Sequence, residues 1–148
     1  MTRQAVDNAL DLIAATPGYE HAARRLRRAR IRLDPGLSDR AQTSLGGQIT
    51  LGPEPFAGTG DAARVSLAGT LVHEHFHLRQ NPLEKTASFW LGIATRRHPM
   101  RRYEAPAYAA HLEFLRQLAC AHPALEDEAQ REINQVRAAF ACHYGPLP

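Results

Sequence analysis

Residues 71–77 contain the pattern His-Glu-x-x-His, formed by His73, Glu74 and His77. On an α-helix, side chains four residues apart lie on one face with Cβ atoms about 5–6 Å apart, so both imidazoles can bind one metal ion. Imidazole nitrogens bind zinc at roughly 2.0–2.1 Å, which this spacing permits. Glu74 lies one residue further round the helix, where its carboxylate can reach a water on the metal. The pattern therefore predicts a zinc site with an adjacent base.

A third metal ligand must come from elsewhere in the chain, because catalytic zinc is usually held by three protein ligands and a water. No third histidine follows at the spacing of the extended His-Glu-x-x-His-x-x-Gly-x-x-His pattern. Glu104 and Glu113 lie on a later candidate helix and offer carboxylate oxygens. Glu104 would also suit a surface position at a helix start, where the helix dipole favours an acid. These alternatives stay open at this point.

With the His-Glu-x-x-His pattern and Glu104, the sequence resembles the gluzincins, zinc metallopeptidases whose third ligand is a glutamate on a helix after the motif helix. The resemblance extends over roughly residues 45–115. It implies a zincin-like fold, Zn²⁺ as cofactor, a peptide or protein substrate, and Glu104 as the third ligand. Several gluzincins carry an acid four residues after this glutamate, beside a zinc histidine, whereas this chain has Tyr108.

The predicted reaction is zinc-dependent hydrolysis of a peptide bond. Zinc lowers the pKa of its bound water from its very high ordinary value toward about 7 and polarises the scissile carbonyl. Glu74 is expected to take a proton from that water as general base and to pass it to the leaving amine. Tyr108 and His111 share a helical face with Glu104, and either could donate a hydrogen bond to the oxyanion. We predict Glu74 and Tyr108 as catalytic residues, although a tyrosine that only packs in the core is the commoner case.

Two other functional classes stay open. One is a catalytically degenerate zincin scaffold that keeps its metal and acts as a sensor or protein-interaction module, which Tyr108 and the small size motivate. The other is a nucleic-acid-binding protein, because arginines crowd residues 24–32 and 96–102. No aromatic residue is interleaved with the first cluster for stacking on bases, so we interpret it as a solvated helix face. Nucleic acid is therefore not expected as a partner.

The chain has 148 residues and a formal net charge of +3. This length suits one hydrophobic core, so we expect a single zincin-like domain at residues 1–148. No apolar run reaches the length that spans a bilayer, and the N-terminal residues do not form a signal peptide, so no membrane partner is expected. The two cysteines, Cys120 and Cys142, both fall in helical patterns, which indicates reduced thiols and a cytoplasmic protein.

The N-terminal half of the chain shows patterns of both helices and strands. Helical spacing of apolar residues predicts a helix at residues 3–15 and a second helix that Thr16 caps and Pro17 begins. Residues 31–33 alternate and indicate a strand. Residues 46–52 also alternate, which predicts a half-buried strand before the motif helix.

The strand at residues 46–52 could contribute to substrate binding. In zincin folds, a strand just before the motif helix often forms the sheet edge along which an extended substrate lies. If these residues form that edge, a peptide would add to it by backbone hydrogen bonds. An ordinary strand whose outer edge is covered is an equally good interpretation.

Helical patterns account for most of the remaining chain. The motif lies on an amphipathic helix that ends before Pro82. Further helices are predicted at about residues 83–94, from Glu104 to about Ala121, and from Pro123 to Gly145. Together with the strands, these helices predict an α+β fold, a mostly helical domain with a small mixed sheet on one side. The resemblance to the gluzincins implies that this domain is zincin-like.

Overall fold

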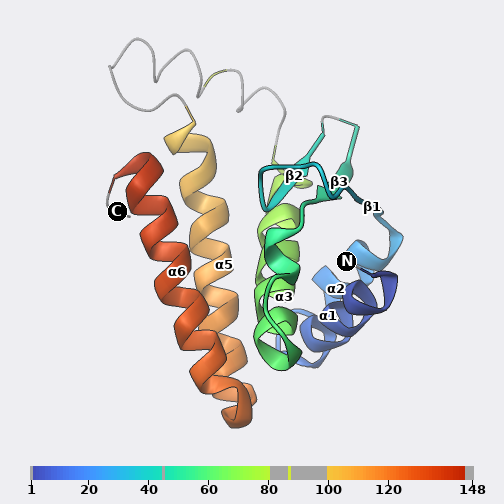
Figure 1. Ribbon diagram of the computed structural model, residues 1–148, viewed down its shortest axis with the longest axis vertical. Coiled ribbons are helices and arrows are strands. Elements are labelled where there is room, and N and C mark those ends of the chain that lie inside the picture. The colour runs from blue at the N-terminus through green and yellow to red at the C-terminus, as the bar shows by residue number, and fades with distance from the viewer. Residues whose placement is uncertain (1, 45, 81–86, 88–99, 146–148) are drawn as a thin grey trace.

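The computed structural model describes residues 2–44, 46–80, 87 and 100–145. Its long helices are α1 (Arg3–Ala15), α2 (Glu20–Arg28), α3 (Gly60–His77), α5 (Arg101–Ala121) and α6 (Glu126–Tyr144). Figure 1 shows α3 between two helix pairs, with α1 and α2 on one side and α5 and α6 on the other. A small sheet lies beside the C-terminal end of α3. That end of the central helix carries the histidine motif.

From Val65 to its end at His77, the central helix α3 has no exposed residue. Val65, Leu67, Ala68 and Leu71 are almost completely buried, and α3 packs against all four of the other long helices. Burial therefore extends beyond the predicted amphipathic stripe, and the helix that carries the motif is packed on several sides.

The sheet contains three described strands, β1 (Arg30–Leu33), β2 (Ala41–Thr43) and β3 (Gln48–Leu51), in the order β1-β3-β2. β3 pairs in parallel with β1 and antiparallel with β2, so it is the central strand. Of the two interpretations of residues 46–52, the substrate edge is therefore wrong and the covered strand is confirmed, because both sides of β3 already hydrogen-bond to neighbouring strands. The edge beside the motif helix is β2, a strand that was not predicted.

The boundary between the first two helices also differs from the prediction. The first helix has the predicted bounds, but Thr16 does not cap the second one. Its hydroxyl donates instead to the carbonyl oxygen of Leu12 at 3.0 Å, at the end of α1. Gly18 then adopts a left-handed conformation with φ of 85°, and α2 begins at Glu20. Pro17 therefore belongs to the turn between the helices.

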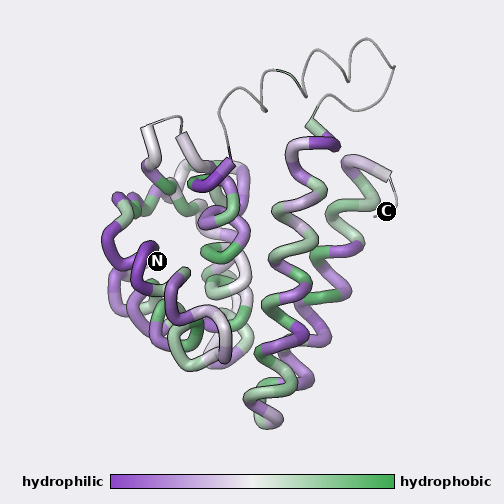
Figure 2. Tube along the Cα trace, turned by 180° about the vertical axis from the view of Figure 1, so that it is seen from behind, coloured by the Kyte–Doolittle hydropathy of each residue, from purple (hydrophilic) through white to green (hydrophobic). Residues whose placement is uncertain are grey.

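The C-terminal helices α5 and α6 lie side by side (Figure 1). Hydrophobic and hydrophilic residues alternate along both helices in Figure 2, as expected where one face of each is packed. Phe114 and Leu118 of α5 and Phe140 of α6 are fully buried. The short 3₁₀ helix η2 (Pro123–Leu125) precedes α6, and another, η1 (Glu54–Phe56), precedes α3.

The described chain is an α+β structure, mostly helical with a small mixed sheet, as predicted. The helix predicted at residues 83–94 lies outside the described residues, apart from residue 87. Within the described part of the chain, no helix combines the length and apolar composition needed to cross a bilayer. Cys120 and Cys142 are both exposed, free thiols.

Candidate metal centre

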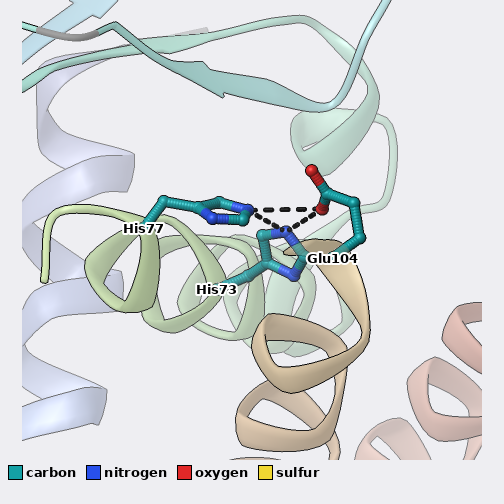
Figure 3. Close-up of side chains that lie close together, drawn as sticks. All are labelled: His73, His77 and Glu104. Carbon is teal, nitrogen blue, oxygen red and sulfur yellow. Dashed lines mark hydrogen bonds and ion pairs between the residues drawn. The ribbon is translucent and has the colours of Figure 1, made fainter. Parts of the chain in front are cut away.

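The helices α3 and α5 bring the three predicted metal ligands together, as Figure 3 shows. His73 and His77 lie one turn apart near the C-terminal end of α3, and Glu104 lies in the first turn of α5. The Nε2 atoms of the two histidines are 3.0 Å apart. Each of them is 3.3 Å from Oε2 of Glu104. Among the described residues, these side chains form a group that could hold a metal ion.

The spacing of the three donor atoms fits a bound metal ion. A tetrahedral ion with bonds of roughly 2.0–2.2 Å holds its ligand atoms roughly 3.3–3.6 Å apart. The observed separations of 3.0 and 3.3 Å are close to that range. Two imidazole nitrogens and a glutamate oxygen are also one of the donor sets of catalytic zinc, which leaves a fourth position for water or substrate. Both the geometry and the donor chemistry are therefore suitable.

The charges of the ligands reinforce one another. Burial disfavours the ionised form of Glu104, but its hydrogen bonds with His73 and His77 outweigh burial and lower the pKa of this carboxyl to about 2. Burial likewise acts to lower the pKa of His77, yet its hydrogen bond to Glu104, together with the charges of Glu104 and Glu74, raises it. An ionised carboxylate thus draws a cation toward the imidazoles, and protons compete with metal there.

The alternative ligand Glu113 lies away from the metal centre. Its side chain is 52% exposed on α5. It accepts hydrogen bonds from Arg116 at 3.3 Å and from Gln117 at 3.0 Å, both on the same helix. Glu104 is therefore the glutamate that the fold places beside the histidines.

Glu74 lines a cavity of about 520 Å³ together with the three ligands. Its side chain is oriented by the sheet, because Oε2 accepts a hydrogen bond of 2.6 Å from the Thr43 hydroxyl on β2. Glu74 is only 4% exposed, so few positions are open to its carboxylate. Sequence reasoning missed Thr43, since the short strand that carries it gives no periodic signal.

Tyr108 lies between the ligands and α6. Its ring meets the His73 ring edge-on, with centroids 4.8 Å apart, and it lines the cavity. On its other side it contacts Phe140, with centroids 5.0 Å apart. Burial, followed by the charge of Glu104, raises the pKa of Tyr108. The hydroxyl therefore stays protonated at neutral pH and is a possible hydrogen-bond donor.

His111 lies deeper in the fold than Tyr108. It is 3% exposed, and its Nε2 atom is packed so closely against Gly69 of α3 that a Cβ at that position would collide with the ring. The same atom is 4.0 Å from Oε1 of Glu132, which is too far for a hydrogen bond. Burial lowers the pKa of His111 well below its usual value. Of the two candidate oxyanion donors, Tyr108 is thus the better placed.

A partly buried ion pair links the start of the edge strand to the helices. Arg40, the residue before β2, lies 2.6 Å from the Glu132 carboxylate on α6. Its guanidinium also donates to the hydroxyl of Ser66 on α3. Glu132 is buried and the Arg40 side chain is 22% exposed, so removing Arg40 would leave a buried carboxylate without this partner, and the contact resists movement of the strand. Because Arg40 directly precedes β2, this ion pair also helps to hold Thr43 beside Glu74.

Gln80 is a second residue that sequence reasoning missed. It follows the end of α3, and its side chain contacts both Nδ1 of His77 and the backbone oxygen of Tyr103. The rings of His77 and Tyr103 are stacked, with centroids 4.8 Å apart. No spacing rule marks this glutamine, because its partners lie on two different helices.

Comparisons with protein families, characterised proteins and solved structures give no match to this chain. The resemblance to the gluzincins therefore stays an expectation that comes from the motif residues. A functional proposal has to be built on the side chains of the site and their geometry.

Proposed function

We propose that this protein is a zinc-dependent peptidase of the gluzincin type. The observation that carries the proposal is the 3.0–3.3 Å spacing of two imidazole nitrogens and one carboxylate oxygen. The cavity beside these donors also holds Glu74, a buried carboxylate that is not part of the ligand group. A metal position next to a separate base is what hydrolysis by an activated water requires.

Each of these side chains has a distinct role in the proposed reaction. His73, His77 and Glu104 would hold Zn²⁺, which supplies a water of lowered pKa and a Lewis acid for the scissile carbonyl. Glu74, held by Thr43, takes a proton from the attacking water and passes it to the leaving amine. The Tyr108 hydroxyl donates a hydrogen bond to the oxyanion that develops on the carbonyl.

The substrate backbone adds to the outer edge of β2. The backbone of Ser44 donates to Gln48, and the backbone oxygen of Arg40 accepts from Gly52, so the even-numbered residues face β3. In an antiparallel ladder the alternate residues then point outward, which leaves backbone groups of Ala41 and Thr43 for an extended peptide. In the described part of the chain, no strand pairs with this side of β2. Peptide placed there lies beside the metal centre.

The decisive experiment compares zinc content and hydrolysis of a mixed peptide library for the parent and Glu74→Gln. The amide keeps the shape of Glu74 but cannot act as a base, so zinc stays bound while turnover falls roughly 10²–10⁴-fold. Glu113→Gln, an equivalent change on the exposed face of α5, leaves both quantities unchanged. Parental turnover by Glu74→Gln excludes hydrolysis by this motif. A zinc-loaded parent that cleaves nothing is instead a metal-binding scaffold.

A further inference from the structure

Gln80 connects the two helices that carry the metal ligands. Its Oε1 atom is 2.6 Å from Nδ1 of His77, and its Nε2 atom donates to the backbone oxygen of Tyr103 at 3.0 Å. Tyr103 directly precedes Glu104 in the first turn of α5. One side chain therefore contacts the second ligand at one end and the neighbour of the third ligand at the other.

The backbone oxygen of Tyr103 determines the direction of these hydrogen bonds. A carbonyl oxygen can only accept, so Gln80 must turn its NH₂ group toward Tyr103. The amide oxygen then faces His77, and because it too can only accept, Nδ1 of His77 must carry the hydrogen. With hydrogen held on Nδ1, a metal ion can replace the second ring hydrogen and bind the lone pair of Nε2. That nitrogen lies 3.3 Å from the Glu104 carboxylate, which would be the next ligand of the same ion.

The backbone around Gln80 is held well enough for this side chain to act as a support. Its N–H bonds to the carbonyl oxygens of Phe76 and His77, both at 3.2 Å, so Gln80 remains attached to the last turn of α3. The Tyr103 ring stacks on the His77 ring with an interplanar angle of 9°, which limits rotation of the imidazole. The His77 ring is thus held by two neighbours: the stacked Tyr103 ring limits its rotation, and the amide oxygen of Gln80 accepts a hydrogen bond from its Nδ1.

We propose that Gln80 is a positioning residue of the metal centre. It keeps His77 in the tautomer whose Nε2 can bind metal, and it sets the distance between the end of α3 and the first turn of α5. Metal-binding histidines generally donate their second N–H to a fixed acceptor, and losing that acceptor costs about 10–100-fold in metal affinity. The proposal rests on the metal centre of the proposed function but not on peptide hydrolysis.

An amide is the side chain that satisfies both ends of this bridge. A carboxylate at position 80 would accept from Nδ1 of His77, but it has no hydrogen to donate to the Tyr103 oxygen. An aliphatic side chain would do neither. Gln80→Glu and Gln80→Leu therefore separate the two contacts.

The test measures Zn²⁺ affinity by competition with a chromophoric chelator. Gln80→Leu is expected to bind zinc about 10–100-fold more weakly than the parent, and Gln80→Glu is expected to lie between the two. The control is Gln117→Leu, because Gln117 is an exposed glutamine of α5 whose side chain donates to Glu113 of the same helix at 3.0 Å. Its zinc affinity should equal that of the parent. Parental affinity in Gln80→Leu overturns the proposal.

A second measurement does not depend on activity. In the zinc-loaded protein, the Nδ1 hydrogen of His77 is followed by ¹H–¹⁵N NMR, because a fixed acceptor slows its exchange with water. Its signal should be sharp in the parent and in Gln80→Glu, and broadened or lost in Gln80→Leu. An equally protected signal in Gln80→Leu excludes the role of Gln80. A parent that binds zinc but cleaves no peptide contradicts the proposed hydrolysis alone and leaves this test intact.

Discussion

Thr43 of the edge strand donates a hydrogen bond of 2.6 Å to Glu74 of the central helix. The contact crosses from the sheet to α3 and reaches the residue beside His73, the first candidate metal ligand. It involves only one carboxylate oxygen of Glu74, Oε2. The sheet thus orients the proposed base, while the helices place the candidate ligands.

The first prediction concerns this hydrogen bond. Thr43→Val keeps the branched shape that suits a strand but removes the donor, so Glu74 loses its orientation. A hydrogen bond to a charged group contributes about 1.5–3 kcal/mol, which corresponds to a fall in kcat on the order of 10–100-fold. Zinc affinity should not change. Thr43→Ser retains the hydroxyl and should restore most of kcat, and an unimpaired Thr43→Val enzyme would show that the contact is only structural.

The second prediction separates the two glutamates of α5. Glu104→Ala removes a donor oxygen that lies 3.3 Å from both histidines, so zinc affinity should fall by at least roughly 10–100-fold. The rise in thermal stability that zinc gives the parent should fall with it, since ligand binding stabilises the native state. Calorimetric titration and melting curves with and without zinc measure both. Glu113→Ala is the matched control, and equal losses in the two variants would contradict the assignment.

The third prediction concerns the Tyr108 hydroxyl. If it donates to the oxyanion, Tyr108→Phe lowers kcat on the order of 10²-fold with little change in KM, because the contact forms mainly in the transition state. Tyr19→Phe removes a tyrosine hydroxyl away from the cavity and should leave both constants unchanged. Steady-state kinetics on one peptide substrate decide the matter. A parental kcat in Tyr108→Phe would assign the ring to packing alone.

The fourth prediction tests the substrate edge. Ala41→Pro removes a backbone N–H that points outward from β2, a position where an edge strand tolerates proline. KM should rise while zinc content and melting temperature stay close to those of the parent. Ala41→Val keeps the N–H and adds comparable bulk, so it should retain a parental KM. Unchanged KM in a folded Ala41→Pro variant would remove β2 as the binding edge.

The fifth prediction concerns acid stability through His75. His75 lies between the two motif histidines in the sequence, and its side chain is buried in the fold. Burial, followed by the charges of Arg79 and Arg25, lowers its pKa from 6.5 to about 4. The unfolded chain therefore binds a proton at a pH where the native state does not. This contribution to stability is complete above about pH 6.5 and is lost as the pH falls toward about 4.

Replacing His75 should flatten that part of the pH profile. In His75→Gln the free energy of unfolding should fall less between pH 7 and pH 4 than it does in the parent. Denaturant titrations at several pH values, with a chelator present to remove bound metal, give the two profiles. Parallel profiles would mean that His75 does not report the acid transition.

The helices could be predicted from sequence because each buries a periodic set of apolar side chains. The bounds of α1 and the end of α5 at Ala121 agree with the pattern. The start of α2 was wrong because Thr16 bonds backward to Leu12 and Gly18 turns the chain. Such boundaries depend on individual polar contacts that periodicity does not contain.

The sheet could be predicted only in part. β2 contains just Ala41–Thr43, too few residues to establish an alternating pattern. Its pairing with β3, and the parallel pairing of β1 with β3, join segments that are not neighbours along the chain. Without β2, the sequence could not decide whether residues 46–52 form a sheet edge or a covered strand. The register of a sheet is a tertiary property, so local sequence could not separate these two interpretations.

The residues of the candidate site, like the sheet, could be predicted from sequence only in part. His73 and His77 converge because they are four residues apart on one helix, a relation that the sequence contains in full. Glu104 meets them through the packing of α5 on α3, and only its donor chemistry and the gluzincin pattern indicated it beforehand. Thr43 and Gln80 gave no signal, because each acts through one hydrogen bond formed when separate elements meet.

The close approach of His111 to Gly69 makes these two positions interdependent. The imidazole fills the space that a side chain on α3 would need, so position 69 can enlarge only if position 111 becomes smaller. In related sequences the two positions should therefore vary as a pair rather than independently. A glycine four residues before the first motif histidine, coupled to a histidine on the later helix, would mark this helix packing in chains where the short histidine motif alone is ambiguous.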